Sequence, residues 1–112
     1  MRVVLNSFIP FRGFIAITLW PFIFVRKSVA DNYTFVDDRH EHIHGRQQLE
    51  MLILPFLLWY IIEWLVRLIV THDFLRAYRS ISFEREAYEN EYDEHYLSHR
   101  RPYAWLRYLV SS

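Results

Sequence analysis

The chain contains no cysteine among its 112 residues, which excludes a disulfide-stapled fold, a thiolate zinc site and cysteine catalysis. Glycine is almost as scarce, since only Gly13 and Gly45 are present. Phosphate-binding and dinucleotide-binding loops need several glycines close together, so neither is expected. Net charge is lacking as well, because 13 basic residues balance 13 acidic ones. The sequence therefore gives no overall electrostatic reason to expect a nucleic-acid partner.

Apolar residues, by contrast, are abundant. Hydrophobic residues make up 53% of the chain and aromatic residues 19%, more than the core of a small soluble domain needs. The length suits one domain, residues 1–112. We therefore expect a large exposed apolar area, which a membrane or a second copy in a homo-oligomer would cover.

The pattern of apolar and polar residues predicts a mainly α protein with a small β-hairpin, an α+β arrangement. Short runs rich in β-branched and aromatic residues predict two strands with a bend at Trp20-Pro21. Asp37 or Asp38 is the expected N-cap of the first long helix, and Ser82 that of the third. The expected elements are a strand pair at 14–26 (14–19 and 22–26), a helix at 38–53, an apolar helix at 56–70, a helix at 83–96 and a short aromatic helix at 103–109.

One apolar segment, residues 49–70, is long enough to span a bilayer. Glu63 and Arg67 within it would each cost up to ~3 kcal/mol in lipid unless they pair. Two interpretations stay open, a helix that backs the core and a helix in contact with a membrane. No cleaved signal peptide is expected, since Arg26 and Lys27 follow the earlier apolar run where cleavage needs small neutral residues. The predicted location is cytoplasmic or membrane-associated.

The stretch "DDRHEHIHGRQQLE" holds His40, Glu41 and His44 in the order H-E-x-x-H. On a helix the two histidines lie one turn apart, with Cβ atoms about 5–6 Å from each other. Both imidazoles can then bind one Zn²⁺, while Glu41 stands beside the metal and can take a proton from a zinc-bound water. A solvated, histidine-rich surface helix could carry the same H-E-x-x-H sequence. A candidate for a third ligand is therefore needed to distinguish a zinc site from such a helix.

The stretch "SFEREAYENE" supplies two candidates for that ligand, Glu84 and Glu86. Helical periodicity places Glu84 on one face with Ala87, which allows close helix contact, and with Tyr88, a predicted hydrogen-bond partner for a histidine. Glu86 points toward the charged exterior. We therefore expect Glu84 to bind the metal, although a solvated acidic face remains the alternative. Gln48, two turns along the first helix, is expected to hydrogen-bond a neighbouring helix behind the site.

"HEHIHGRQQLE" followed by "FEREAY" resembles the gluzincin metallopeptidases over about residues 14–92. The similarity is greatest to their minimal members and to the catalytic cores of membrane-embedded metallopeptidases. In that family HExxH is followed by a glutamate on a later helix, in an E-x-x-A context. Tyr88 stands where many relatives carry an aspartate that orients a ligand histidine. The matching residues are His40, Glu41, His44, Glu84 and Ala87.

The resemblance implies a zincin-like minimal catalytic domain that binds Zn²⁺ and hydrolyses peptide or protein substrates, with Glu41 as general base. Hydrolysis also needs a donor for the developing oxyanion, and the candidates are Tyr92, His72 and His95. Two other interpretations remain. The chain is either a non-enzymatic or latent zinc-binding module, associated with membranes or oligomeric, in which Glu41 is dispensable, or a helical membrane-anchored protein without metal.

Overall fold

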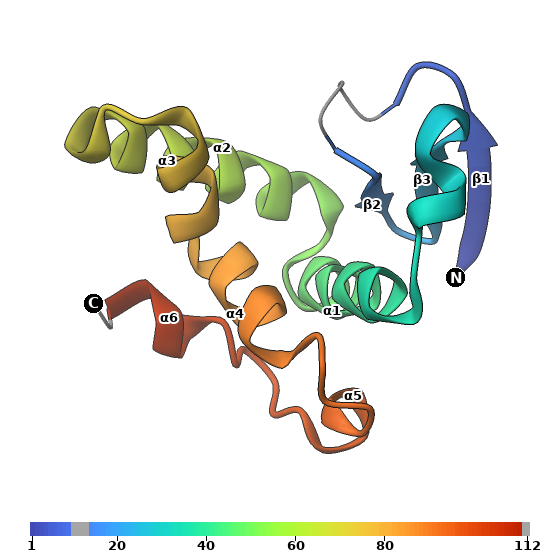
Figure 1. The fold of residues 1–112 in the computed structure, drawn as a ribbon. Coiled ribbons are helices and arrows are strands. Elements are labelled where there is room, and N and C mark those ends of the chain that lie inside the picture. The colour runs from blue at the N-terminus through green and yellow to red at the C-terminus, as the bar shows by residue number, and fades with distance from the viewer. Residues whose placement is uncertain (10–13, 111–112) are drawn as a thin grey trace.

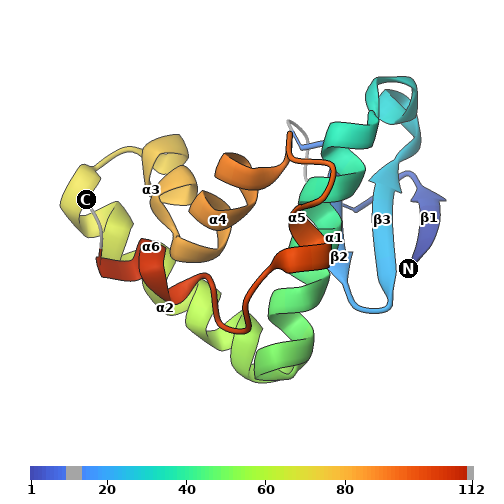
Figure 2. The same cartoon turned by 90° about the horizontal axis from the view of Figure 1, so that it is seen from below.

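A computed structural model describes residues 1–9 and 14–110 and confirms a mainly α protein with a small β-sheet (Figure 1). The sheet lies at one side of the molecule, and helices make up the rest (Figure 2). The elements are, in chain order, β1 (Arg2–Asn6), β2 (Ala16–Leu19), β3 (Phe22–Arg26), the 3₁₀ helix η1 (Lys27–Asn32), α1 (Phe35–Met51), α2 (Ile53–Thr71), α3 (Phe74–Ser80), α4 (Ser82–Asn90), α5 (Tyr96–His99) and α6 (Leu106–Val110).

The predicted strand pair is present as the antiparallel hairpin of β2 and β3, in which Ala16 lies opposite Val25. β1, which was not predicted, pairs with β3 in parallel and gives the strand order β1-β3-β2. β2 is therefore an edge strand. Its Thr18 is buried, and the Thr18 hydroxyl donates a hydrogen bond to the Glu41 backbone oxygen of α1 at 3.0 Å. This contact holds the sheet against the helix that carries the HExxH motif.

The first long helix begins earlier than predicted. Thr34 is the N-cap, and its side chain accepts from the Asp37 N–H while the Asp37 carboxylate accepts from the Thr34 N–H at 2.9 Å. The predicted cap at Asp37 or Asp38 was wrong because Asp37 is the third residue of a capping box. At the other end, Leu52 adopts a positive φ of 65° and separates α1 from α2. Pro55 then falls in the first turn of α2, where its missing N–H removes no helical hydrogen bond.

The glutamate helix is shorter than the predicted 83–96, since α4 ends at Asn90. Ile81 occupies the N-cap position, so the prediction of Ser82 as cap was wrong. Ser82 is the first helical residue, and both its N–H and its hydroxyl donate to the buried Glu63 carboxylate of α2, each at 2.6 Å. A carboxylate from another helix thus accepts from the first N–H group of α4, as a local capping side chain normally would. The short helix α3 was not predicted either.

Two buried clusters hold the helices in place. Phe56 of α2, Ile81 and Phe83 at the start of α4, and Trp105 form one cluster. The other consists of Ile43 of α1, Ala87 of α4 and Tyr96 of α5. Ala87 is fully buried where α1 and α4 pack together, as expected for a small residue at a close helix contact. The two helices that carry the candidate ligands are therefore packed directly against each other.

Candidate metal centre

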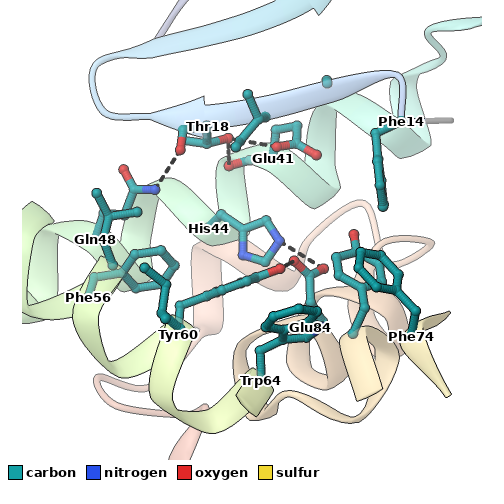
Figure 3. A pocket seen from close by; sticks show the side chains of 15 residues that line it. Phe14, Thr18, Glu41, His44, Gln48, Phe56, Tyr60, Trp64, Phe74 and Glu84 are labelled. Carbon is teal, nitrogen blue, oxygen red and sulfur yellow. Dashed lines mark hydrogen bonds and ion pairs between the residues drawn. The ribbon is translucent and has the colours of Figure 1, made fainter. Parts of the chain in front are cut away.

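Three side-chain atoms converge between α1 and α4. The Glu84 Oε1 atom lies 3.0 Å from His40 Nε2 and 3.1 Å from His44 Nε2, and the two Nε2 atoms are 3.2 Å apart. All three residues are buried. The sequence predicted this set, and the structure brings it together as a group that can hold a metal ion. His44 and Glu84 are seen facing each other in Figure 3.

The other ring nitrogen of each histidine contacts an acceptor. His40 Nδ1 lies 2.6 Å from a Glu91 carboxylate oxygen, and His44 Nδ1 lies 2.8 Å from the Gln47 amide oxygen. The orientation of that amide is fixed because its NH₂ group donates to a backbone oxygen and to a carboxylate. Each Nδ1 therefore carries a hydrogen, and in the neutral form of each ring Nε2 has a lone pair that faces Glu84.

Three lone pairs that face one another repel unless a cation lies among them. Bonds of about 2.0–2.1 Å in a tetrahedral zinc site separate neighbouring ligand atoms by roughly 3.3 Å. The separations of 3.0–3.2 Å found here are close to that value. Donor type, spacing and tautomers therefore all fit a metal ion held by His40, His44 and Glu84.

The site favours positive charge. Burial lowers the pKa of His40, but hydrogen bonds to the Glu84 and Glu91 carboxylates outweigh burial and raise that pKa to about 10. Burial acts on Glu84 in the opposite sense, yet the adjacent His44 and His40 hold the pKa of Glu84 well below its usual range. Glu84 is thus ionised, and protons and metal ions compete for the same lone pairs.

Glu41 lies beside the cluster rather than in it, as predicted. Its carboxylate shares the Thr18 hydroxyl proton with the Glu41 backbone oxygen, at 2.8 Å and 3.0 Å respectively. Burial raises the pKa of Glu41, and the neighbouring histidines His44 and His40 oppose that shift in part. Glu41, His44 and Glu84 all line one cavity (Figure 3).

That cavity has a volume of about 270 Å³. Its polar side is formed by Glu41, His44 and Glu84 together with Thr18 of β2 and Gln48 of α1. The remaining walls are mainly apolar and aromatic (Figure 3). An apolar side chain of a ligand can therefore be buried directly beside the metal cluster. The aromatic residues of the lining are Phe14, Phe56, Tyr60, Trp64, Phe74 and Tyr78.

Two residues predicted to support the site have other contacts than expected. Gln48 bonds the strand and not a helix: its NH₂ donates to the Thr18 oxygen and its amide oxygen accepts from the Trp20 N–H, both at 2.7 Å. Tyr88 packs its ring against His40, with centroids 4.5 Å apart, while its hydroxyl contacts another tyrosine. Glu91 takes the orienting role instead. Its position seven residues after Glu84, on the same helical face, was the signal for it.

The three oxyanion candidates are exposed, and none is among the cavity-lining residues of the described chain. Tyr92 and His95 lie in the turn that follows the early end of α4. His72 adopts a left-handed conformation at the C-terminal end of α2. The tyrosines that do line the cavity are Tyr60 and Tyr78. Neither was predicted. Tyr60 lies in an apolar helix, where the sequence does not show which way a hydroxyl points, and Tyr78 lies in α3, which was not predicted as a helix.

Tyr60 and Glu86 complete the surroundings of the ligands. The Tyr60 hydroxyl donates to the second Glu84 oxygen at 2.7 Å. Glu86 is fully buried, so its predicted exterior position was wrong. It accepts from Arg100 at 3.0 Å and from Gln47 at 2.9 Å, and thus supports the residue that orients His44.

No protein-family model, curated protein or solved structure matches the chain. The relationship to gluzincins therefore stays a prediction from the two motifs.

Proposed function

We propose that the protein is a zinc-dependent peptidase in which Glu41 is the general base. The observation that carries this proposal is the convergence of His40 Nε2, His44 Nε2 and Glu84 Oε1 at the wall of a cavity that Glu41 also lines. Two imidazoles and one carboxylate are a donor set of catalytic zinc sites, and they leave a coordination position open. When bound, zinc lowers the pKa of a water molecule and polarises a carbonyl group.

The chain's own residues hold this arrangement in place. Glu91 and Gln47 fix the two rings, and Tyr60 fixes the second oxygen of Glu84. Such contacts raise the basicity of ligands and restrict their motion. The metal-binding atoms are therefore preorganised.

Glu41 moves the proton. Its carboxylate accepts a proton from the attacking water as the new C–O bond forms, and delivers it to the leaving amine as the C–N bond breaks. The Thr18 hydroxyl holds one carboxylate oxygen, which leaves the other oxygen for this exchange. The apolar walls of the cavity favour a peptide with a large apolar side chain next to the bond that is cut.

Metal content is the first test. Protein purified without added metal is expected to hold about one zinc per chain by elemental analysis, and cobalt substitution should give the visible absorption of a four-coordinate site. If zinc titration of a metal-free sample leaves the chain without bound metal, the proposal fails.

The base is tested separately with Glu41→Gln, which keeps the shape of the side chain. The variant should bind zinc like the parent and cleave none of the peptides that the parent cleaves from an apolar-rich library. Equal cleavage by both proteins contradicts the role of Glu41. Zinc binding without cleavage by the parent would instead favour the non-enzymatic or latent zinc-binding module.

A further inference from the structure

We infer that α2 docks on a lipid bilayer through the face that it turns away from the rest of the protein. This surface, called the α2 outer face below, is defined by six exposed aliphatic residues. They recur at helical spacing over the length of the helix and are between 53% and 77% exposed. Its members are Leu54, Leu58, Ile62, Val66, Ile69 and Val70.

The distribution of polarity in α2 is reversed. A surface helix normally turns apolar residues inward and charged residues toward water. Within α2, all of which the structure describes, the charged residues are Glu63 and Arg67. Glu63 is buried and bonded to Ser82, and Arg67 reaches Glu63 and the Leu109 backbone oxygen. The charges thus serve contacts inside the protein, while the outward side is hydrocarbon. Water is not the environment that such a face fits.

The size of the face also favours lipid. From Leu54 to Val70 a helix extends about 25 Å, and α2 is long and apolar enough to cross a membrane, with 11% of its most apolar stretch buried. Protein–protein interfaces carry about one hydrogen bond per 100–200 Å². The aliphatic α2 outer face offers no side-chain donor or acceptor for such bonds, and a bilayer interior requires none.

The charged residues at the edge of this surface also favour a lipid partner. The apolar surface continues beyond α2 onto Phe74 and Leu75 of α3, which are 56% and 61% exposed. The exposed Arg76 and Arg79 follow on the same short helix. Cationic side chains beside an apolar surface suit the phosphate groups of anionic lipids.

The cavity borders this surface. Ile61 and Phe74 are exposed and at the same time line the cavity. If the protein is the proposed peptidase, a peptide that partitions into the bilayer reaches the metal centre from the membrane surface. Docking itself depends on neither zinc nor Glu41.

The experiment is flotation of the full chain with vesicles of phosphatidylcholine and phosphatidylglycerol. The parent is expected to float with the vesicles. The double variant Leu58→Glu, Ile62→Glu should show at least a tenfold lower bound fraction, because it places two charges on the α2 outer face. Leu5→Glu is the matched control: Leu5 is 54% exposed on β1, away from α2 in both views (Figures 1 and 2), and this variant should float like the parent. Circular dichroism checks that all three proteins are folded.

Two results would overturn the inference. One is flotation of a folded double variant to the same extent as the parent. The other is a parent that stays with the unbound protein. If that parent also sediments as a dimer that the double variant converts to monomers, a second copy covers the face in place of lipid. The Glu41→Gln variant separates this proposal from the proposed function, because it should float like the parent whether or not the parent cleaves peptides.

Discussion

Replacing each of the two central glutamates of α4 should affect zinc binding very differently. Structural zinc sites with four protein ligands bind with about 10–16 kcal/mol, or about 3 kcal/mol for each ligand. Glu84→Gln weakens one ligand whose oxygen lies 3.0 and 3.1 Å from the two histidine nitrogens. The change keeps the shape of the side chain, and an amide oxygen can still accept from Tyr60. We therefore expect roughly 100-fold weaker zinc binding, the equivalent of about 3 kcal/mol.

Glu86→Gln is the matched control, since it makes the same chemical change two residues away. Glu86 touches the site only through Gln47, so zinc affinity should fall by about tenfold at most. Its effect should appear in stability instead. The change removes one carboxylate from the buried Arg100, which keeps Glu50 as a partner at 2.9 Å. Breaking a buried ion pair costs about 3 kcal/mol.

Competition with a chromophoric chelator measures the zinc affinity of both variants, and denaturant unfolding measures their stability. The expected pattern is weak zinc binding by Glu84→Gln, and near-parental zinc binding with a lower free energy of unfolding for Glu86→Gln. The reverse order of zinc affinities would refute the assignment of Glu84 as ligand. Equal affinities for both variants and the parent would show that neither carboxylate binds the metal.

Three further substitutions probe contacts around the site. Glu91→Gln removes the charge that orients a ligand histidine, and chelator competition should show about 10–100-fold weaker zinc binding; an unchanged affinity would show that the contact is dispensable. Ser82→Ala removes a 2.6 Å hydrogen bond to a buried carboxylate, so denaturant unfolding should show a loss of about 1.5–3 kcal/mol. Gly45→Ala should raise the free energy of unfolding by up to ~1 kcal/mol, because alanine favours the helix and the added carbon comes too close only to the movable end of the Met1 side chain. A loss of stability would show that Met1 cannot shift.

Local geometry was the predictable part of the site. Residues four apart on a helix face the same way whatever surrounds the helix, so the pairing of His40 with His44 followed from sequence alone. The same rule separated Glu84 from Glu86, because 100° per residue turns them to different sides of α4. The β2–β3 hairpin was likewise predictable from two short apolar runs around a bend. These features depend on contacts between near neighbours in the chain.

The missed features depend on partners far away in sequence. β1 gains its hydrogen bonds from a strand 20 residues later, and its own five residues carry no turn signal toward that partner. Glu86 looked solvated because its cation, Arg100, comes after a turn that the expected long helix did not contain. The early end of α4 at Asn90 had a second consequence. It put Glu91 at the helix end, in reach of His40, and left Tyr92 in an exposed turn.

The geometry of the candidate metal centre depends on the placement of α4. His40, Glu41 and His44 share one helix, so the backbone of α1 alone fixes their relative positions. Glu84 has to be brought to them from another element, and the start of that element is held by the Glu63 carboxylate through Ser82, two residues before the ligand. Glu63 belongs to α2, whose opposite side is the α2 outer face. The one helix that we infer to contact lipid is thus also the helix that anchors the proposed third metal ligand. A shift of α2 would reach Glu84 through the buried Glu63 carboxylate and through the Tyr60 hydroxyl, which donates to Glu84 directly.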